Sequence, residues 1–451
     1  MFDRAPPTRH WTTRAGDRRD MSRRATRVLP PWLVLPVGLL LIGALQACAD
    51  TARMDLQRSV AARAAANETL HVRTMGADGQ FSELDAATVA RHLRSAMDGM
   101  SLNVLALSGG GAGGAFGAGA LVGLTRGNER PDFAVVTGVS AGALIAPYAF
   151  LGPAWDSKLT ESYTSGSGKN VLQFRGLGAV FGSSVYRGAP LARLIERYVD
   201  DELVRAIAAE ERRGRLLLVA TTDVDTGQAV VWDLGSIALY GGAEARARFR
   251  DVLVASASVP GMFPPVILQI PEHDQTEVEA HVDGGVTLPF FTAADLVGAA
   301  RAPGSSRGSP GSAHIYVIVD GPLDEPVRVT PRRAGVILAR SVSASLRRMM
   351  RLTLEQSAAE AQARGILLDY SAMPASYPYS NAFDFSAAAM APLFRYSAEC
   401  AHGALLWVPA EPASQVVPGS VDRLPCPAED RSIERFAGLG RAEAENPTRR
   451  P

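Results

Sequence analysis

The chain has 451 residues, of which 47% are hydrophobic and 20% are charged. This composition is typical of a globular protein with a large core and excludes a chain that stays disordered. Its 46 basic and 46 acidic residues cancel, so the sequence predicts no nucleic acid partner.

The first 48 residues have the layout of a secretory signal segment. A basic start precedes an apolar run over residues 33–45, and small residues lead to Cys48. The run is shorter than the ~20 residues that a helix needs to span a bilayer, as is usual in signal peptides. "LQAC" (45–48) resembles the bacterial lipobox, whose cysteine is lipidated and becomes the mature N-terminus. The alternative is ordinary signal cleavage, with Cys48 incidental.

We therefore expect an exported lipoprotein, anchored to a membrane of the bacterial envelope through Cys48. Ala49 after that cysteine favours the outer membrane. In an exported protein the remaining two cysteines, Cys400 and Cys426, are a candidate disulfide. Two unconnected buried thiols are the alternative.

Three further segments follow the signal. Residues 49–99 are rich in alanine and arginine and predict a tether with a helical lead-in. Residues 100–410 are the predicted catalytic domain, with the core motifs over 100–320 and a helical cover over 321–410. Residues 411–451 form a polar, proline-containing tail.

A strand, a glycine turn and a helix follow one another twice within the domain. Strands are predicted over 102–108 and 133–138, because both are nearly continuous apolar runs of the kind that parallel sheets bury on both faces. A glycine-rich stretch (109–119) follows the first strand, and a helix from Ala141 to about Phe150 follows the second. This pattern predicts an α/β fold with a mainly parallel sheet.

The rest of the domain adds strands and then helices. Residues 215–234 predict two strands joined by a turn, 248–260 a helix that ends at a proline, and 279–286 and 313–321 two more strands. The later regions 334–365 and 383–407 read as helices that cover the sheet. For the second, an apolar lid or acyl-chain channel is the alternative.

Ser140 lies in the G-x-S-x-G sequence "GVSAG" (138–142), between a predicted strand and a predicted helix. A serine nucleophile has to protrude from a sharp turn, and small flanking residues make room for that turn. The alternative is a small residue in a glycine-rich bend. The flanking elements favour the nucleophile.

Three glycines, Gly109, Gly110 and Gly111, follow the first strand. Their unobstructed N–H groups could stabilise the oxyanion of a tetrahedral acyl intermediate, and one such donor is worth ~3–4 kcal/mol. The stretch also satisfies a dinucleotide-binding pattern, but no acidic residue closes the next strand, as such a site requires. Acyl transfer is the better interpretation.

The general base is predicted to be Asp283, in "HVDGG" (281–285), where a strand ends at two glycines. A partly buried carboxylate could take the serine proton directly. A triad through His281 is the alternative, although an acid two residues from a histidine rarely has room to orient it.

The motifs "SGGGAGG", "GVSAG" and "VDGG", in this order, resemble those of the patatin-like acyl hydrolases and phospholipases, over roughly residues 100–320. The segment "SASVPGMFPPV" (256–266) is also similar to that family. The resemblance implies a three-layer α/β/α fold, a Ser140–Asp283 dyad, a main-chain oxyanion hole at Gly109–Gly111, and neither metal nor cofactor. The family usually has arginine or lysine where this chain has Gly113.

The resulting prediction is a serine acyl hydrolase that cleaves lipid carboxylic esters, as phospholipases A and lysophospholipases do, through an acyl-enzyme. Its partners would be a lipid ester substrate and a membrane surface reached through the lipidated N-terminus. The alternative is a non-catalytic envelope lipoprotein of the same fold that binds lipid or a protein partner.

Overall fold

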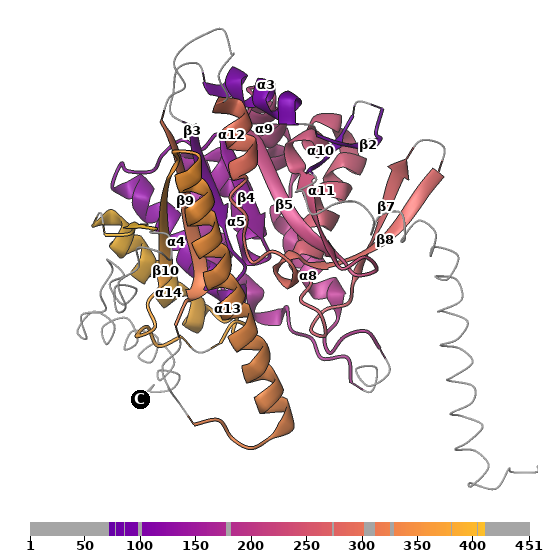
Figure 1. The fold of residues 1–451 in the computed structure, drawn as a ribbon. Helices are drawn as coiled ribbons and strands as arrows, with labels where there is room; N and C mark the ends of the chain where they lie inside the picture. Colours follow the sequence, from indigo (N-terminus) through magenta and orange to yellow (C-terminus); the bar gives the residue numbers. More distant parts are fainter. Residues whose placement is uncertain are drawn as a thin grey trace, which may run out of the picture. The chain divides into compact units, whose positions relative to one another are not determined.

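A central β-sheet organises the chain in this computed structural model (Figure 1). The structure describes residues 72–76, 78–84, 86–97, 102–176, 182–272, 275–301, 312–324, 329–379, 381–403 and 405–410. Within them the strands are β1 (Val72–Met75), β2 (Phe81–Glu83), β3 (Leu102–Leu107), β4 (Val135–Val139), β5 (Leu216–Asp223), β6 (Gln228–Asp233), β7 (Val266–Glu272), β8 (Gln275–Asp283), β9 (Ala313–Pro322), β10 (Leu367–Met373) and β11 (Val408–Pro409).

Helices connect and cover these strands. They are α3 (Ala86–Met97), α4 (Gly114–Arg126), α5 (Ala141–Leu151), α6 (Asp156–Thr164), α8 (Gly188–Tyr198), α9 (Asp201–Glu211), α10 (Leu234–Tyr240), α11 (Gly242–Ser256), α12 (Ala294–Arg301), α13 (Ala334–Ala363) and α14 (Ala387–His402). Short 3₁₀ turns lie at Gly111–Gly113, Pro153–Trp155, Ser167–Asn170 and Gly284–Val286.

The middle of the sheet is parallel. In the order β10-β9-β3-β4-β5, every neighbouring pair of strands is parallel. Strands β6 and β8 both pair antiparallel with β5, and the β7–β8 hairpin extends from there. The predicted α/β fold with a mainly parallel central sheet is therefore confirmed.

Helices cover both faces of the sheet because alternate side chains of a strand point to opposite faces. Leu105 and Leu107 of β3 belong to one apolar core, which α4, α5, α8, α9, α10, α11 and α14 complete. Val104 and Ala106 of the same strand belong to a second core, which α3, α12 and the carboxyl-terminal half of α13 complete. The central strands are thus buried on both faces, as their continuous apolar sequences require.

Two regions differ from the sequence-based expectation. Within the predicted lead-in over 49–99, β1 pairs with β6 and with β2, and α3 packs against α12. The predicted helical cover over 321–410 also holds two strands, because β10 extends the sheet beside β9 and β11 pairs with β10. Strands β1, β2 and β11 have only four, three and two residues, and β10 carries Asp369 and Ser371 among its apolar residues, so their apolar pattern is weak in the sequence.

The parallel strands β3, β4 and β9 end at one common edge of the sheet. The glycine-rich loop follows β3 there, and the turn that holds Ser140 follows β4. This edge is where open α/β sheets usually bind their ligands.

Candidate active site

Ser140 occupies a strained turn between β4 and α5. Its backbone angles are φ 54° and ψ −118°, a conformation that costs a residue with a side chain ~1–3 kcal/mol. The N–H of Gly142 donates to the carbonyl oxygen of Ser108 at 3.0 Å. A Cβ atom on Gly142 would lie 2.4 Å from the carbonyl oxygen of Leu107. The glycine thus lets α5 start against the end of β3, and the predicted strand–turn–helix is present.

The side chain of Ser256, at the end of α11, holds this turn from the other side. Its hydroxyl donates to the carbonyl oxygen of Ala220 at 2.7 Å and accepts the N–H of Ser140 at 3.0 Å. The sequence does not mark Ser256 itself, although the segment 256–266 begins with it. A serine in a buried helix end carries no signal of its own in the sequence.

The structure brings Ser140 and Asp283 together. The Ser140 hydroxyl donates to Oδ2 of Asp283 at 2.5 Å, and the N–H of Gly285 donates to Oδ1 at 2.7 Å. Asp283 is the last residue of β8, and the antiparallel pairing of β8 with β5 sets it opposite Thr221. The side chain of Asp283 therefore reaches the turn after β4, two strands away in the sheet.

Both members of this pair are buried, with Ser140 7% and Asp283 4% exposed. Burial raises the pKa of Asp283 to about 7, and the hydrogen bonds from Ser140 and Gly285 lower it only in part. A carboxyl group with such a pKa can both accept and release a proton near neutrality.

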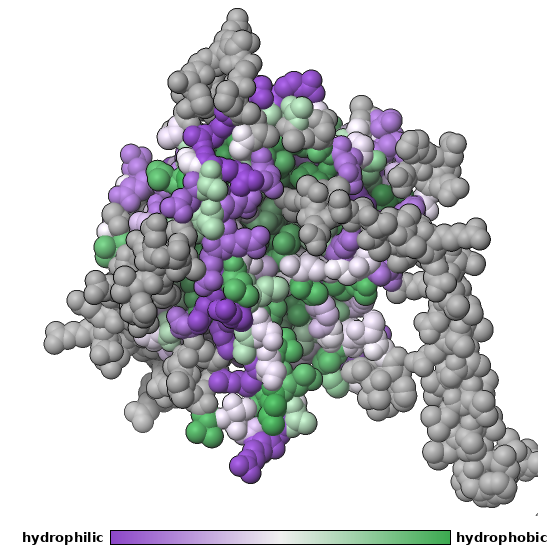
Figure 2. Space-filling view, in the orientation of Figure 1, coloured by the Kyte–Doolittle hydropathy of each residue, from purple (hydrophilic) through white to green (hydrophobic). Residues whose placement is uncertain are grey.

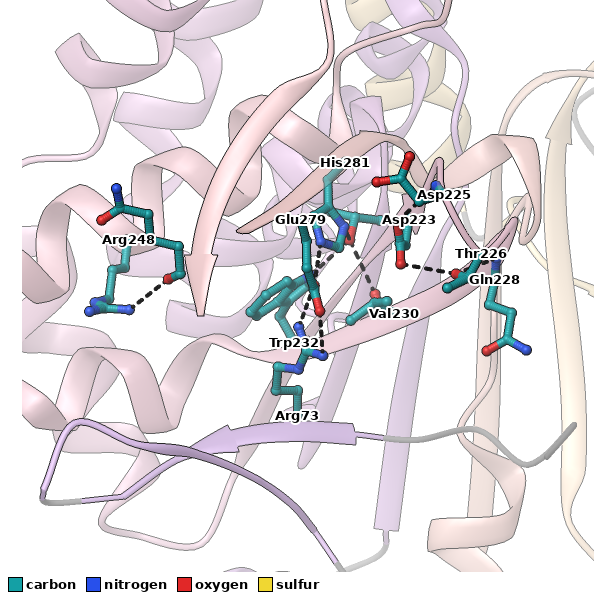
Figure 3. Close-up of polar contacts among 12 residues, drawn as sticks. Arg73, Asp223, Asp225, Thr226, Gln228, Val230, Trp232, Arg248, Glu279 and His281 are labelled. Carbon is teal, nitrogen blue, oxygen red and sulfur yellow. Dashed lines mark hydrogen bonds and ion pairs between the residues drawn. The ribbon is translucent and has the colours of Figure 1, made fainter. Parts of the chain in front are cut away.

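His281 lies two residues before Asp283 but belongs to a different set of contacts (Figure 3). Its Nδ1 is hydrogen-bonded to Thr221 Oγ1 at 2.9 Å and its Nε2 to Glu279 Oε2 at 2.8 Å. Arg73 of β1 forms an ion pair with the same Glu279 oxygen at 2.8 Å, and the indole N–H of Trp232 donates to Thr221. Both ring nitrogens are engaged in this buried network, so the alternative triad through His281 is not formed.

The glycine-rich loop after β3 packs directly on the serine, since a Cβ on Gly109 would lie 3.1 Å from Cβ of Ser140. The N–H of Gly109, however, donates to the carbonyl oxygen of Pro289 at 3.1 Å. The prediction of Gly109 as an oxyanion donor is therefore wrong for this conformation. The N–H groups of Gly110 and Gly111 donate to no acceptor within the described residues.

An apolar pocket opens beside Ser140 and Gly111. Its empty volume is ≈ 1010 Å³, counted with its opening to solvent. Apolar side chains from α5, α8, α9, α11, the start of α14 and the residues just before it form most of the wall, among them Leu144, Ile195, Leu203, Leu253, Phe385 and Met390. Residues 383–407, for which an apolar lid or acyl-chain channel was the alternative, thus cover the sheet and also contribute to this wall.

Three further findings concern the predicted chemistry of the chain. Among the described residues, no group of three or more His, Cys, Asp or Glu side chains is placed to hold a metal ion. No described helix is both long and apolar enough to cross a bilayer. Cys400 is buried in α14 and is disulfide-bonded, whereas Cys48 and Cys426 lie outside the described residues, so their predicted roles stay predictions.

A model of the family described as patatin-like phospholipase matches residues 105–294, which include the glycine-rich loop, Ser140 and Asp283. Over these residues the chain is similar to the patatin-like phospholipase family. The match confirms the family resemblance seen over roughly residues 100–320.

Among solved structures, the crystal structure of VipD from Legionella pneumophila is similar to this patatin-like protein. The sequences are 10% identical, the alignment covers 84% of this chain and 78% of that chain, and the TM-score is 0.32. No curated protein matches the chain.

The family resemblance implies a basic residue at the position of Gly113, and the structure shows what surrounds this glycine. A Cβ on Gly113 would lie 2.0 Å from the carbonyl oxygen of Asp320, so no larger residue fits this backbone. Asp320 lies in β9, next to the end of β3. Its N–H donates to Ser108 Oγ at 2.9 Å, and its Oδ1 accepts the N–H of Gly117 at 2.9 Å.

Asp320 and Tyr379 thus support the glycine-rich loop of this patatin-like chain. The Tyr379 hydroxyl donates to the carbonyl oxygen of Gly110 at 3.2 Å. Asp320 is fully buried, and burial raises the pKa of its carboxyl group well above its usual range. The sequence predicted neither residue as part of the site. The signal that could have found Asp320 is "VDG" (319–321) at the end of a buried strand, the same pattern that marked Asp283.

Proposed function

We propose that this patatin-like protein is a serine acyl hydrolase that cleaves carboxylic esters of lipids through an acyl-enzyme on Ser140, with Asp283 as the general base. The observation that carries the proposal is the 2.5 Å hydrogen bond from the Ser140 hydroxyl to Asp283, beside an apolar pocket that Ser140 lines. An activated nucleophile of this kind needs its base within hydrogen-bond reach.

The first half of the reaction transfers the acyl group to the enzyme. Ser140 Oγ attacks the ester carbonyl carbon while Asp283 Oδ2 takes the hydroxyl proton. The N–H groups of Gly110 and Gly111 are the donors proposed for the oxyanion, since they have no acceptor among the described residues. When the tetrahedral intermediate collapses, the bond to the alcohol breaks, and Asp283 returns its proton to the leaving oxygen.

The second half releases the acid. Asp283, again ionised, takes a proton from a water molecule, whose oxygen attacks the acyl carbon of the Ser140 ester. Collapse of the second tetrahedral intermediate frees the carboxylic acid, and Asp283 gives the proton back to Ser140 Oγ. A pKa of about 7 suits both steps, because one group has to act as base and as acid in each cycle.

The pocket supports a lipid as the source of the acyl group. An acyl chain gains ~0.8 kcal/mol for each CH₂ group that it buries, and the wall around Leu253 and Met390 is almost wholly apolar. The polar end of the pocket, at Ser140 and Gly111, is where the ester carbonyl would then lie.

The test of the proposed function is labelling with a fluorophosphonate, which reacts with activated serine hydroxyls, together with turnover of lipid esters. The wild type should be labelled and should release fatty acid, and Ser140→Ala should do neither. Equal labelling of a folded Ser140→Ala variant would exclude Ser140 as the nucleophile. A folded wild type that neither reacts nor turns over any ester would favour a non-catalytic lipid-binding lipoprotein.

We also propose that the protein is exported and anchored to the bacterial envelope through lipidated Cys48. This proposal is supported by the signal-like sequence over residues 33–48. Metabolic labelling with an alkyne fatty acid should mark the wild type and not Cys48→Ala. Equal incorporation into both would exclude this anchor.

A further inference from the structure

Two consecutive peptide groups of the glycine-rich loop carry the amides proposed as oxyanion donors. The first joins Gly109 to Gly110 and the second joins Gly110 to Gly111, and both are trans. In a trans peptide the carbonyl oxygen and the N–H group lie in one plane and point in opposite directions. A contact that holds the carbonyl oxygen therefore also sets the direction of the N–H group.

The carbonyl oxygen of the first peptide is held by Ser108. The Ser108 hydroxyl donates to the carbonyl oxygen of Gly109 at 2.8 Å and accepts the N–H of Asp320 at 2.9 Å. Hydrophilic groups on the surface of the molecule (Figure 2) can exchange their partners for water, whereas Ser108 is fully buried and keeps these two bonds. The N–H of Gly110 is consequently directed away from Ser108.

The carbonyl oxygen of the second peptide is held by Tyr379. The Tyr379 hydroxyl and the N–H of Gly113 both donate to the carbonyl oxygen of Gly110, at 3.2 and 3.0 Å. Tyr379 belongs to the segment between β10 and α14, and the carbonyl oxygen of Ala382 in the same segment accepts the N–H of Ala112 at 2.8 Å. This segment therefore holds the loop at two points and directs the second oxyanion amide away from Tyr379.

The peptide group after Ser108 differs from the next two in being bonded at both ends. Its carbonyl oxygen accepts the N–H of Gly142 at 3.0 Å, and its N–H donates to the carbonyl oxygen of Pro289 at 3.1 Å. In the next two peptides only the carbonyl ends are bonded within the described residues, so their N–H ends stay free to donate. These free ends lie beside the nucleophile, because Gly111 lines the same pocket as Ser140.

We propose that Ser108 and Tyr379 are positioning residues of the oxyanion hole, and that each of them aims one main-chain donor at the oxyanion. This inference rests on the proposed hydrolase function and names the side chains that give its oxyanion hole a fixed geometry. Oxyanion donors are effective because they need no reorientation during the reaction. Glycine peptides are conformationally free on their own, so the loop requires contacts of this kind.

The test compares Ser108→Ala with a serine variant that loses the same contacts elsewhere. Ser236 is also buried, and its hydroxyl donates to the carbonyl oxygen of Asp233 at 2.9 Å and accepts the N–H of Met75 at 2.9 Å. It lies in α10, none of whose residues lines the pocket. Ser236→Ala therefore removes an equivalent pair of hydrogen bonds, and a role confined to stability would give both variants the same effect.

The first readout is kcat and KM on a soluble short-chain ester. A misdirected donor loses part of the ~10²–10³-fold that a whole donor contributes, so we expect Ser108→Ala to lower kcat about 10- to 100-fold with little change in KM. Tyr379→Phe should lower kcat by a smaller factor, because the N–H of Gly113 still holds the same oxygen. Ser236→Ala and Tyr370→Phe, the latter at a buried tyrosine of β10, should keep the kcat of the wild type.

The second readout is inhibition by a trifluoromethyl ketone, which forms a tetrahedral adduct with an active serine and places a negative oxygen in the oxyanion hole. Its inhibition constant should rise by the factor by which kcat/KM falls, as expected of a transition-state analogue. An alcohol of the same chain length forms no adduct, and its affinity should not change. Urea unfolding verifies that each variant is folded, and Tyr379→Phe decides the question if Ser108→Ala does not fold.

The outcomes separate this proposal from the proposed function. If the wild type turns over esters and the folded Ser108 and Tyr379 variants keep its kcat and inhibition constant, the positioning role is overturned and the hydrolase stands. Equal losses in Ser108→Ala and Ser236→Ala would also overturn it. A wild type that turns over no ester and binds no fluorophosphonate would refute the proposed function, and the positioning role with it.

Discussion

The hydroxyl of Ser140 donates a hydrogen bond to Oδ2 of Asp283 at 2.5 Å, although 143 residues separate the two in the sequence. The contact forms because β4 and β8 both neighbour β5, and Ser140 and Asp283 stand at the ends of their strands. The chemistry that we propose depends on this one relationship, and most of the following predictions test it.

Replacement of the base should abolish turnover without unfolding the protein. Asp283→Asn keeps the size of the side chain but cannot take the serine proton, so we expect kcat to fall by about 10²–10⁴-fold. The matched variant is His281→Asn, two residues away on the same strand. It should keep kcat/KM within a few-fold and lose ~1–3 kcal/mol of unfolding free energy, because Glu279 and Thr221 lose a buried partner. The opposite pattern would make His281 the base.

The rate should have an acid limb set by Asp283. Burial raises the pKa of its carboxyl group to about 7, and the protonated acid cannot accept the serine proton. We therefore expect kcat/KM to fall tenfold per pH unit below about pH 7, with a plateau above it. The measurement is a pH profile with a soluble ester whose own ionisation is constant. A rate that stays flat down to pH 5 would contradict the base assignment.

The same raised pKa predicts a cost in stability at high pH. In the folded protein Asp283 holds its proton up to about pH 7, whereas in the unfolded chain it releases it near its ordinary value of 3.8. The folded state thus binds more protons between these values, so its free energy of unfolding falls as pH rises through this window. The asparagine of Asp283→Asn does not ionise, so the variant does not lose this stability.

We accordingly expect Asp283→Asn to be more stable than the wild type at pH 8, by on the order of a few kcal/mol. Below pH 4 the two should differ little. Urea unfolding at several pH values measures the difference. A variant that is less stable than the wild type at pH 8 would show that ionised Asp283 stabilises the fold.

Gly113 should tolerate no side chain. The Cβ of Gly113→Ala would lie 2.0 Å from the carbonyl oxygen of Asp320, so the loop that carries Gly110 and Gly111 would have to move. Displaced oxyanion donors reduce kcat by about 10²–10³-fold, with a smaller change in KM. Gly321→Ala is the control, since nothing lies within 4 Å of the added atom. Full activity of Gly113→Ala would mean that the loop does not supply the donors.

The pocket should set the preferred acyl length. Leu144 lies one turn after Ser140 in α5 and lines the pocket, so Leu144→Trp should fill space next to the reacting ester. We expect kcat/KM for a sixteen-carbon ester to fall at least tenfold, with little change for a butyrate ester. Leu151→Trp, on the same helix but away from the pocket wall, should not change this ratio. Equal loss on both esters would indicate general damage to the site.

The fold and the centre of the site could be read from the sequence to a large extent. The continuous apolar runs at 102–108 and 133–138 predicted β3 and β4, because strands buried on both faces have no polar alternation. The family motifs marked Ser140 and Asp283 correctly as neighbours. Strands β1, β2, β10 and β11 were missed, because β1, β2 and β11 are only four, three and two residues long and Asp369 and Ser371 interrupt the apolar pattern of β10.

The details of the site depended on contacts between distant segments. The sequence alone offered three glycines as oxyanion donors, and the tertiary structure removed Gly109, because its N–H meets the carbonyl oxygen of Pro289. It also introduced Ser256 and Tyr379, which no local pattern marks, and Asp320, whose "VDG" pattern (319–321) does not by itself tell which segment it contacts.

What the sequence determined by itself was therefore the local chemistry: which residues form strands, where glycines allow sharp turns, and which serine stands on such a turn. These features follow from short-range sterics and from hydrophobic periodicity, and both depend only on residues that are close together in the sequence. Only the tertiary structure decided which base reaches Ser140, which amides stay free to donate, and which side chains hold the peptides that carry these amides. Each of these depends on how strands pair and helices pack across more than a hundred residues, and no local pattern records that.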